Sequence, residues 1–100
     1  MKGYQERLEM IEKRVGEKID VELRMEEHKI LVLIGKYDFV YQFRVDKRKR
    51  IIIQRVSVRS DERIFTLPRR ISFAADSVAR IVLENLVIKH RENPNQLSLF

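Results

Sequence analysis

The hydrophobic positions of this chain change their spacing from helical to strand-like within the first 25 residues. They recur every three or four residues between Tyr4 and Val15, with polar side chains between them. This spacing predicts an amphipathic helix over residues 4–15. Gly16 follows at once and is suited to end that helix, because glycine readily adopts a left-handed conformation. Hydrophobic and charged residues then alternate from 19 to 25, which predicts a strand with one face toward solvent.

Three further strands are predicted in the middle of the chain. Residues 30–34 are apolar without alternation, which is typical of a central strand buried on both faces. Gly35-Lys36 is a short turn signal, and residues 37–45 then alternate aromatic or aliphatic with mostly polar side chains. A turn at 46–49 leads into a strand over 50–59. These patterns favour antiparallel pairing of consecutive strands.

The register of the last two strands decides which side chains share a face. A two-residue turn would set Asp46 opposite Lys49. The pairs would then be Phe43 with Ile52, Tyr41 with Gln54, and Phe39 with Val56. The aromatic side chains would face the core, and the opposite face would carry Arg44, Arg55, Ser57 and Arg59 beside Val40, Ile51 and Ile53. A slip of one residue would exchange the faces of a strand.

The remaining pattern predicts a turn, two short strands and a helix. Residues 60–62 suit the turn, and 64–67 read as a short strand that Pro68 interrupts. Residues 69–73 can resume as an edge strand, and 75–91 have helical spacing up to the breakers Asn93 and Pro94. The predicted fold is α+β: an N-terminal helix, an antiparallel meander of four to five strands, a C-terminal helix and a flexible tail.

The composition indicates one domain in a soluble chain. One hundred residues suffice for one hydrophobic core, which we assign to residues 1–92, with 93–100 as the tail. Cysteine is absent, so thiolate zinc sites and disulfides are excluded. No apolar run approaches the length of a membrane span, and no secretory leader is apparent. We expect a cytoplasmic, nucleoid-associated protein that needs no cofactor.

The basic residues are concentrated in one quarter of the sequence. Between Arg44 and Arg70 there are ten Lys or Arg against three acids, a balance of +7, whereas the whole chain carries +6. Clustered cations displace counterions from phosphates, so this segment favours nucleic-acid binding over a merely solvated face. The candidate contacts are Arg44, Lys47, Arg48, Lys49, Arg50, Arg55, Arg59, Arg69 and Arg70.

The last five residues carry the most specific motif. Two leucines and a phenylalanine follow the helix-breaking segment 92–95. Gln96-Leu97-Ser98-Leu99-Phe100 resembles, at all five positions, the Gln-Leu-(Ser or Asp)-Leu-Phe peptide by which bacterial polymerases, mismatch-repair proteins and clamp-loader components bind the DNA sliding clamp. The resemblance implies that Gln96 orients the peptide, Leu97 packs, and Leu99 with Phe100 fill an apolar pocket. The alternative is that the tail packs on its own domain.

A weaker resemblance concerns the domain itself. Residues 34–86, with Pro68-Arg69-Arg70-Ile71-Ser72-Phe73 before a helix, look like the single-stranded-DNA-binding domain of positive cofactor four. That family has a curved four-stranded sheet followed by one helix, and it dimerises. Arg70 stands where the family usually has glycine, and the first helix and strand of this chain are additional. The resemblance implies a preference for single-stranded DNA.

Other constellations are less specific. The alternating aromatics of residues 37–43 could stack on bases, but strict alternation favours core packing. Asp20 with Glu27 and Lys29 loosely resembles the metal-binding set of a nuclease family. His28 and His90 have no metal-ligand spacing around them. We see no nucleophile with a paired base and no phosphate-binding glycine loop.

Together these patterns predict a non-enzymatic accessory or regulatory protein of bacterial or phage DNA replication, repair or recombination. Its expected partners are the sliding clamp, through Gln96–Phe100, and DNA, through a basic sheet face, with single-stranded DNA favoured. A homodimer is an open possibility, and no membrane contact is expected. The alternatives are a clamp-tethered metal-dependent nuclease and a clamp inhibitor that competes for the peptide pocket without binding DNA.

Overall fold

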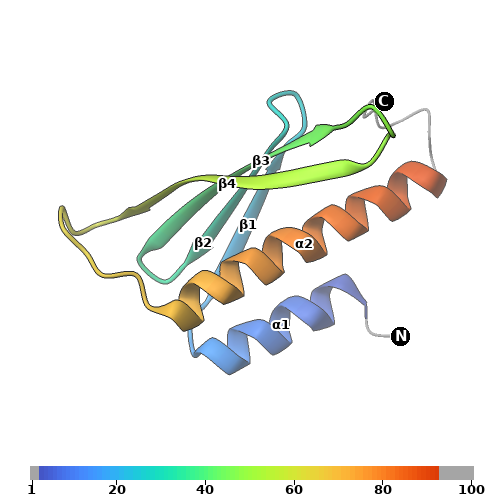
Figure 1. Ribbon diagram of the computed structural model, residues 1–100. Helices are drawn as coiled ribbons and strands as arrows, with labels where there is room; N and C mark the ends of the chain where they lie inside the picture. Colours follow the sequence, from blue (N-terminus) through green and yellow to red (C-terminus); the bar gives the residue numbers. More distant parts are fainter. Residues whose placement is uncertain (1–2, 93–100) are drawn as a thin grey trace.

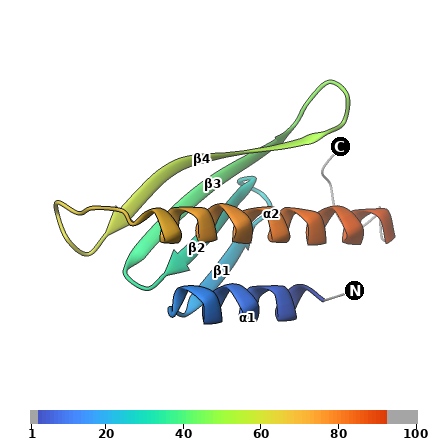
Figure 2. The same cartoon turned by 60° about the horizontal axis from the view of Figure 1, so that its bottom comes forward.

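The chain folds as two layers, with both helices on one face of a four-stranded antiparallel sheet (Figures 1 and 2). The computed structural model describes residues 3–92, and side chains for residues 3–87. The sheet order is β1-β2-β3-β4, so consecutive strands are neighbours and β1 and β4 are the edges. This confirms the predicted α+β meander. The elements are α1 (Tyr4–Val15), β1 (Ile19–Arg24), β2 (Lys29–Ile34), β3 (Tyr37–Val45), β4 (Ile51–Ser60) and α2 (Arg69–Glu92).

The two helices lie side by side and are fixed by local polar contacts. α1 ends at Gly16, whose φ of 72° is the left-handed conformation and whose N–H donates to the Glu12 carbonyl at 2.9 Å. Arg7 on α1 forms an ion pair with Glu84 on α2 at 2.7 Å. Over residues 3–92, neither helix is long and apolar enough to cross a membrane.

The core lies between the sheet and the helices. From the sheet it receives the alternate side chains of β2 and β3, among which Ile30, Val32 and Phe39 are fully buried. From α2 it receives residues at helical spacing, which include Ile71, Ala75, Val78, Val82 and Leu86. The aromatics of β3 therefore face the helices, as their strict alternation predicted.

The opposite face of the sheet, which we call the open face, is not covered by any described element. The prediction that β2 is buried on both faces is wrong, because Leu33 is 41% exposed and Leu31 is only half-buried. Both point away from the helices by strand alternation. A fully apolar strand reads the same whether one or two layers cover it, and this sheet has one layer.

The β3–β4 hairpin differs from the prediction by one residue at its turn. Asp46 pairs with Arg50, not Lys49: the Asp46 N–H donates to the Arg50 carbonyl at 2.9 Å. Lys49 has a left-handed φ of 62°, which gives a three-residue loop instead of two. Phe43 consequently pairs with Ile53 and Tyr41 with Arg55. Neither glycine nor asparagine marks this left-handed position, so the sequence offered no signal for it.

A β-bulge at Val56 then shifts the register by one more residue. Val40 pairs with Ser57, and Phe39 with Val58. The predicted faces are therefore wrong for Ile51, Ile53 and Arg55, which lie on the helix side. They are correct for Ser57 and Arg59, because the two shifts cancel in their effect on side-chain direction.

The two short strands predicted after β4 do not form. Residues 61–68 have no regular secondary structure, and residues 69–73 are the first turn and a half of α2. The Pro68 carbonyl accepts hydrogen bonds from the N–H groups of Ile71 and Ser72, both at 3.1 Å. Proline therefore precedes a helix here, a position that it tolerates well because no N–H is needed. The helix begins six residues earlier than predicted.

Candidate functional site

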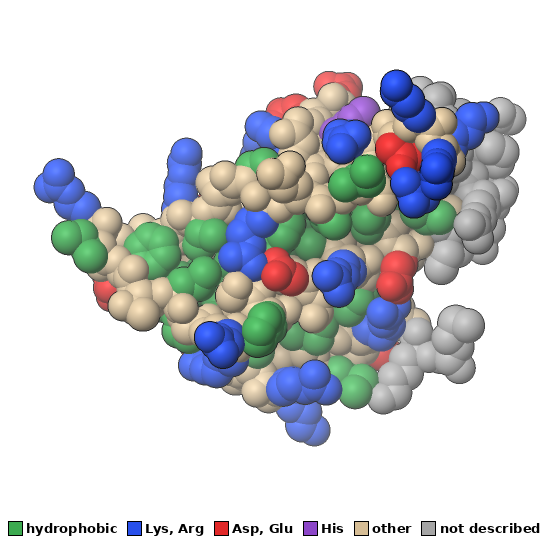
Figure 3. All heavy atoms as spheres, in the orientation of Figure 1, with side chains coloured by type: hydrophobic (Ala, Val, Ile, Leu, Met, Phe, Trp, Pro, Cys, Tyr) green, Lys and Arg blue, Asp and Glu red, His purple; other side chains and the backbone are tan. Residues whose placement is uncertain are grey.

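The predicted DNA-contacting residues do not form one sheet face. Most of them lie at two places, separated by the length of β4: the β3–β4 turn, and the end of β4 with the segment that leads into α2. Arg55 lies between these places, in the middle of β4, and Arg44 lies on β3. Figure 3 shows Lys and Arg side chains prominent at both ends of the molecule. β4 has ten residues, and at about 3.3 Å per residue it separates these places by roughly 33 Å. Residues close in sequence are thus held apart by an extended strand.

The basic turn, residues 46–50, is held by the Asp46 carboxylate. Its Oδ1 accepts the N–H groups of Arg48 at 2.9 Å and Arg50 at 2.8 Å, and its Oδ2 accepts Arg50 Nε at 2.9 Å. The backbone hydrogen bond from Arg50 is the largest contribution to a lowered pKa of Asp46. The carboxylate therefore stays charged and fixes a strained lysine conformation.

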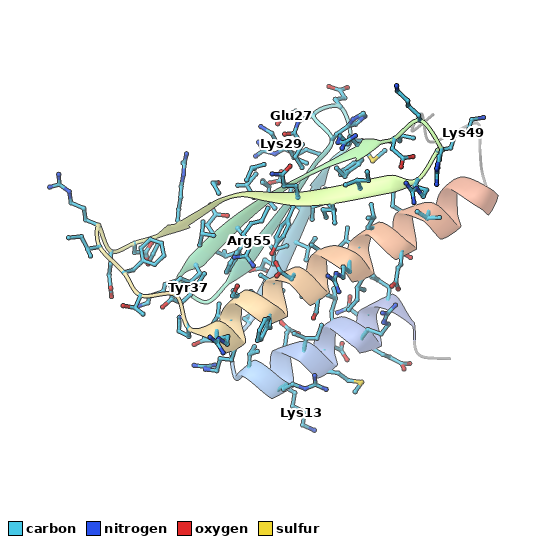
Figure 4. All side chains as sticks on the ribbon, viewed as in Figure 1. Lys13, Glu27, Lys29, Tyr37, Lys49 and Arg55 are labelled. Carbon is cyan, nitrogen blue, oxygen red and sulfur yellow. The ribbon has the colours of Figure 1, made fainter. Side chains whose placement is uncertain are left out.

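Within the basic turn, three cations project without partners among the described residues. The side chains of Lys47, Arg48 and Lys49 are exposed and have no hydrogen bond or ion pair in residues 3–87. Figure 4 shows Lys49 extending from the tip of the hairpin, away from the sheet. Cations held on a rigid hairpin and not neutralised by acids are suited to phosphate contact. Arg50 is different, because Asp46 neutralises it.

Arg55 is committed to an internal cluster. Its guanidinium donates to Asp76 Oδ1 at 2.6 Å and to Ser72 Oγ at 2.8 Å, both on α2. The same Asp76 oxygen accepts the Tyr41 hydroxyl at 2.6 Å. The guanidinium also lies 5.4 Å from the ring centre of Phe39. We call Arg55, Asp76, Tyr41 and Ser72 the Arg55 cluster; Figure 4 shows Arg55 between β4 and α2.

The titration of the Arg55 cluster follows from its partners. Burial raises the pKa of the Tyr41 hydroxyl, and its hydrogen bond to Asp76 raises that pKa further. Burial also raises the pKa of Asp76, but the hydrogen bonds from Tyr41 and Arg55 outweigh it, so the net pKa is lowered. At neutral pH the cluster is therefore a protonated tyrosine, a carboxylate and a guanidinium. Arg55 thus belongs to the link between sheet and helix, which argues against its predicted place among phosphate contacts.

The cluster borders an open cleft between β4 and α2. The cleft has a volume of about 370 Å³ and is lined by Tyr41, Ile53, Arg55, Asp76, Ala79 and Arg80. Sequence reasoning did not single out Asp76 or Ser72. Their spacing of four residues on one helix was a usable signal only once the helix was known to begin at Arg69.

The open face has mixed charge and no aromatic side chain. By alternation its basic residues are Arg24, Lys29, Arg44 and Arg59, and its acidic residues are Asp20, Glu22 and Asp38. Leu31, Leu33, Val40 and Ile52 lie between them. Four cations against three acids give a balance of only +1. A stack of bases on aromatic rings therefore has no platform on this face, within the strands described.

The residues that lead into α2 have separate roles. Arg70 donates through Nη1 to the Val15 carbonyl at 2.7 Å, which satisfies a free carbonyl at the end of α1. Arg69 and Arg59 are exposed, and their side chains have no partner in residues 3–87. Arg70 is thus a structural contact, whereas Arg59 and Arg69 are available to a ligand.

The structure does not bring the candidate nuclease residues together. Asp20 is at the start of β1, whereas Glu27 lies in the β1–β2 turn, at the other end of that strand. Glu27 is 3.7 Å from Lys29 and 3.9 Å from Arg24, which are ordinary surface ion pairs (Figure 4). His28 stacks on Phe43, with ring centres 5.2 Å apart. Among the described residues, no three His, Asp or Glu side chains are grouped so as to hold a metal ion.

The clamp-binding motif, Gln96–Phe100, lies outside the described residues, as does the whole segment 93–100, and the side chain of His90 is likewise not described. The stretch 34–86, which carries the resemblance to positive cofactor four, contains two complete strands, β3 and β4, before α2, whereas that family has four strands before its helix. Comparisons with protein-family models, with curated proteins and with solved structures found no match.

Proposed function

We propose that this chain is a non-enzymatic accessory or regulatory protein of bacterial or phage DNA replication, repair or recombination. It docks on the DNA sliding clamp through Gln96–Phe100 and contacts DNA through the basic turn. The observation that carries the proposal is the five-residue sequence Gln-Leu-Ser-Leu-Phe. Each of its residues agrees with the clamp-binding peptide, in which Leu99 and Phe100 would be the buried anchors.

The fold supports this proposal in one respect, which is that the buried residues of the described core all come from the domain that precedes the peptide. The described core is assembled from residues between Leu8 and Leu86, and its central side chains are fully buried against one another. Docking of a short extended peptide depends on a few buried anchors. Burial of Leu99 and Phe100 yields about 1.5–3 kcal/mol each before the cost of ordering the peptide, so these two anchors supply a large part of the roughly 8 kcal/mol that micromolar binding requires.

The clamp proposal is tested by binding to a purified bacterial clamp. Loss of two anchors at about 1.5 kcal/mol or more each should weaken binding by about 100-fold. We therefore expect Leu99→Ala with Phe100→Ala to abolish measurable binding in surface plasmon resonance. Ser98→Asp is the matched control, because the clamp-binding peptide accepts either residue at that position. Equal binding of the double alanine variant and the control would overturn the proposal.

The DNA contact is proposed on the charge and exposure of Lys47, Arg48 and Lys49. Because no aromatic side chain lies on the open face, the contact that we propose is with phosphates and not with stacked bases. A protein that neutralises phosphates loses affinity linearly on a logarithmic salt scale. Single-stranded and double-stranded DNA of equal length should therefore be titrated at two salt concentrations, and the better ligand identifies the preferred form.

Reversing the charge of two lysines of the basic turn tests whether this turn is the DNA contact. Lys47→Glu with Lys49→Glu should weaken DNA binding and flatten its salt dependence. Lys13→Glu with Lys18→Glu changes the net charge by the same amount on exposed positions near the other end of the fold, and should have a smaller effect. If the two double variants bind DNA equally well, the basic turn is not the contact. A wild-type affinity that ignores salt would rule out phosphate binding altogether.

A further inference from the structure

The two edges of the sheet differ in how they are protected. β1 has six residues, and Asp20, Glu22 and Arg24 alternate along it. β4 has ten residues, contains neither proline nor lysine, and includes five β-branched aliphatic side chains. Natural edge strands are usually short, charged or covered, since a long apolar edge pairs with other chains. Within residues 3–92 no strand pairs with the outer edge of β4.

The backbone of β4 presents its free groups in a definite order. The Phe43 N–H donates to the His28 carbonyl, toward β2, whereas the Asp46 N–H donates to the Arg50 carbonyl, toward β4. Paired antiparallel residues either both face each other or both face away. Phe43 pairs with Ile53, so the N–H and C=O of Ile53 point outward from the sheet. Before the bulge the same holds for Ile51 and Arg55, and after it for Val58 and Ser60.

This outward set is symmetric about the middle of the strand. If a second β4 is laid antiparallel with full overlap, Ile51 falls opposite Ser60 and Ile53 opposite Val58. All four have outward backbone groups, so the pairs can form hydrogen bonds. The agreement depends on the bulge at Val56, because without it positions 58 and 60 would point inward.

The side chains and charges agree with the same register. Ile53 meets Val58 on the helix side, and Gln54 meets Ser57 on the open face. Val56, which is 48% exposed, comes to lie beside the two-fold axis. Beyond the strands, the basic turn of one copy lies beside residues 61–63 of the other. The balances are +3 for residues 46–50 and −1 for 61–63, and Glu62 also pairs with Lys36 at 2.8 Å, so the opposite charges give the ends only a weak attraction. Arg55 is near the axis, but Asp76 neutralises it in each copy.

We propose that β4 is a homodimer interface: two copies pair antiparallel along the full strand, about a two-fold axis at Arg55 and Val56, to form one eight-stranded sheet. The occupant is a second copy and not an unrelated peptide, because the outward groups and the end charges are complementary to themselves. The clefts beside the two β4 strands flank the junction. This interface is independent of clamp docking, and it adjoins the basic turn without including it.

The test uses the absence of cysteine in the chain. In the proposed register, Gln54 of one copy faces Ser57 of the other in a non-hydrogen-bonded pair, with Cα atoms about 4.5 Å apart. That separation suits a disulfide. Within one copy the two positions are about 10 Å apart, which is too far. We therefore expect the full chain with Gln54→Cys and Ser57→Cys to form covalent dimers on mild oxidation, with 54–57 linkages in its disulfide map.

The matched control is Gln54→Cys alone. In the proposed register its cysteine in one copy lies three residues away from the same cysteine in the other copy, so the two should cross-link slowly. Sedimentation equilibrium of the wild-type chain should give twice the mass of 12.1 kDa. A monomer at all concentrations would refute the interface. So would a dimer in which the double variant cross-links no faster than the control, since its contact is then elsewhere. A full chain that stays monomeric, but dimerises when shortened to residue 92, would also refute it by assigning the edge to residues 93–100.

Discussion

Replacement of Asp76 by alanine should destabilise the fold, because this carboxylate joins the sheet to α2. Its Oδ1 accepts the Tyr41 hydroxyl and the Arg55 guanidinium, both at 2.6 Å. In Asp76→Ala, Arg55 keeps Ser72 as an acceptor, whereas the Tyr41 hydroxyl loses the acceptor of its hydrogen bond. The perturbation therefore removes two hydrogen bonds to a charged group and leaves one donor poorly satisfied.

The magnitude follows from the number of bonds and their exposure. Hydrogen bonds to charged groups contribute about 1.5–3 kcal/mol each. The Asp76 side chain is 42% exposed, so water can replace part of the lost hydrogen bonding. We therefore discount the summed contribution of the two hydrogen bonds by roughly half. Alanine favours the helix over aspartate by about 0.5 kcal/mol, which offsets a little more. The expected loss is about 2 kcal/mol, which in a domain of this size lowers Tm by roughly 8–16 °C.

The assay is urea and thermal unfolding followed by far-UV circular dichroism. Glu84→Ala is the matched control, because it also removes an acid of α2 that pairs with an arginine at 2.7 Å. Its side chain is 57% exposed and the pair is on the surface, so about 0–1 kcal/mol is expected. Equal losses for Asp76→Ala and Glu84→Ala would show that the Arg55 cluster has no special weight and would refute the reasoning.

Two further predictions concern the same contacts. The pKa of Asp76 is lowered in the folded chain, so its carboxylate stabilises the fold fully above the ordinary aspartate pKa of about 3.9, and this stabilisation is lost as the pH falls through the pKa of the folded state. The urea midpoints of wild type and Asp76→Asn should therefore converge on acidification. A difference that stays constant with pH would contradict the assignment. Arg70→Ala should cost about 1 kcal/mol by removing the donor to the Val15 carbonyl, whereas Arg69→Ala, beside it, should leave Tm unchanged.

The sequence predicted the order and type of the six elements because their periodicity is local information. Spacing from Tyr4 to Val15 and alternation from Tyr37 to Val45 each depend on neighbours within a few residues. The start of α2 was missed for a related reason. Residues 69–73 hold too few apolar side chains to distinguish period two from period 3.6, and a proline at position 68 is compatible both with a strand break and with the start of a helix.

The candidate site was less predictable, because it depends on distances that sequence order conceals. Its position in the sequence and the sign of its charge associate Arg55 with the basic turn. Its partners Asp76 and Ser72 are 21 and 17 residues away, on an element whose start was misplaced. The exposed cations of the turn needed no such information, since a charged hairpin tip is identified by composition and turn position alone.

Two single-residue shifts in β4 account for both the errors and the proposed interface. The left-handed Lys49 adds one residue to the loop and turns Arg55 toward the helices, where Asp76 neutralises it. The bulge at Val56 adds a second residue, which returns Arg59 to the open face and reverses the direction of the backbone groups beyond it. Without the first shift, Arg55 would be a surface cation; without the second, the outer edge of β4 would not match itself over its full length. Neither shift has a glycine or asparagine to mark it. The pairing of Arg55 with Asp76 and the self-complementary edge of β4 therefore follow only from the observed register.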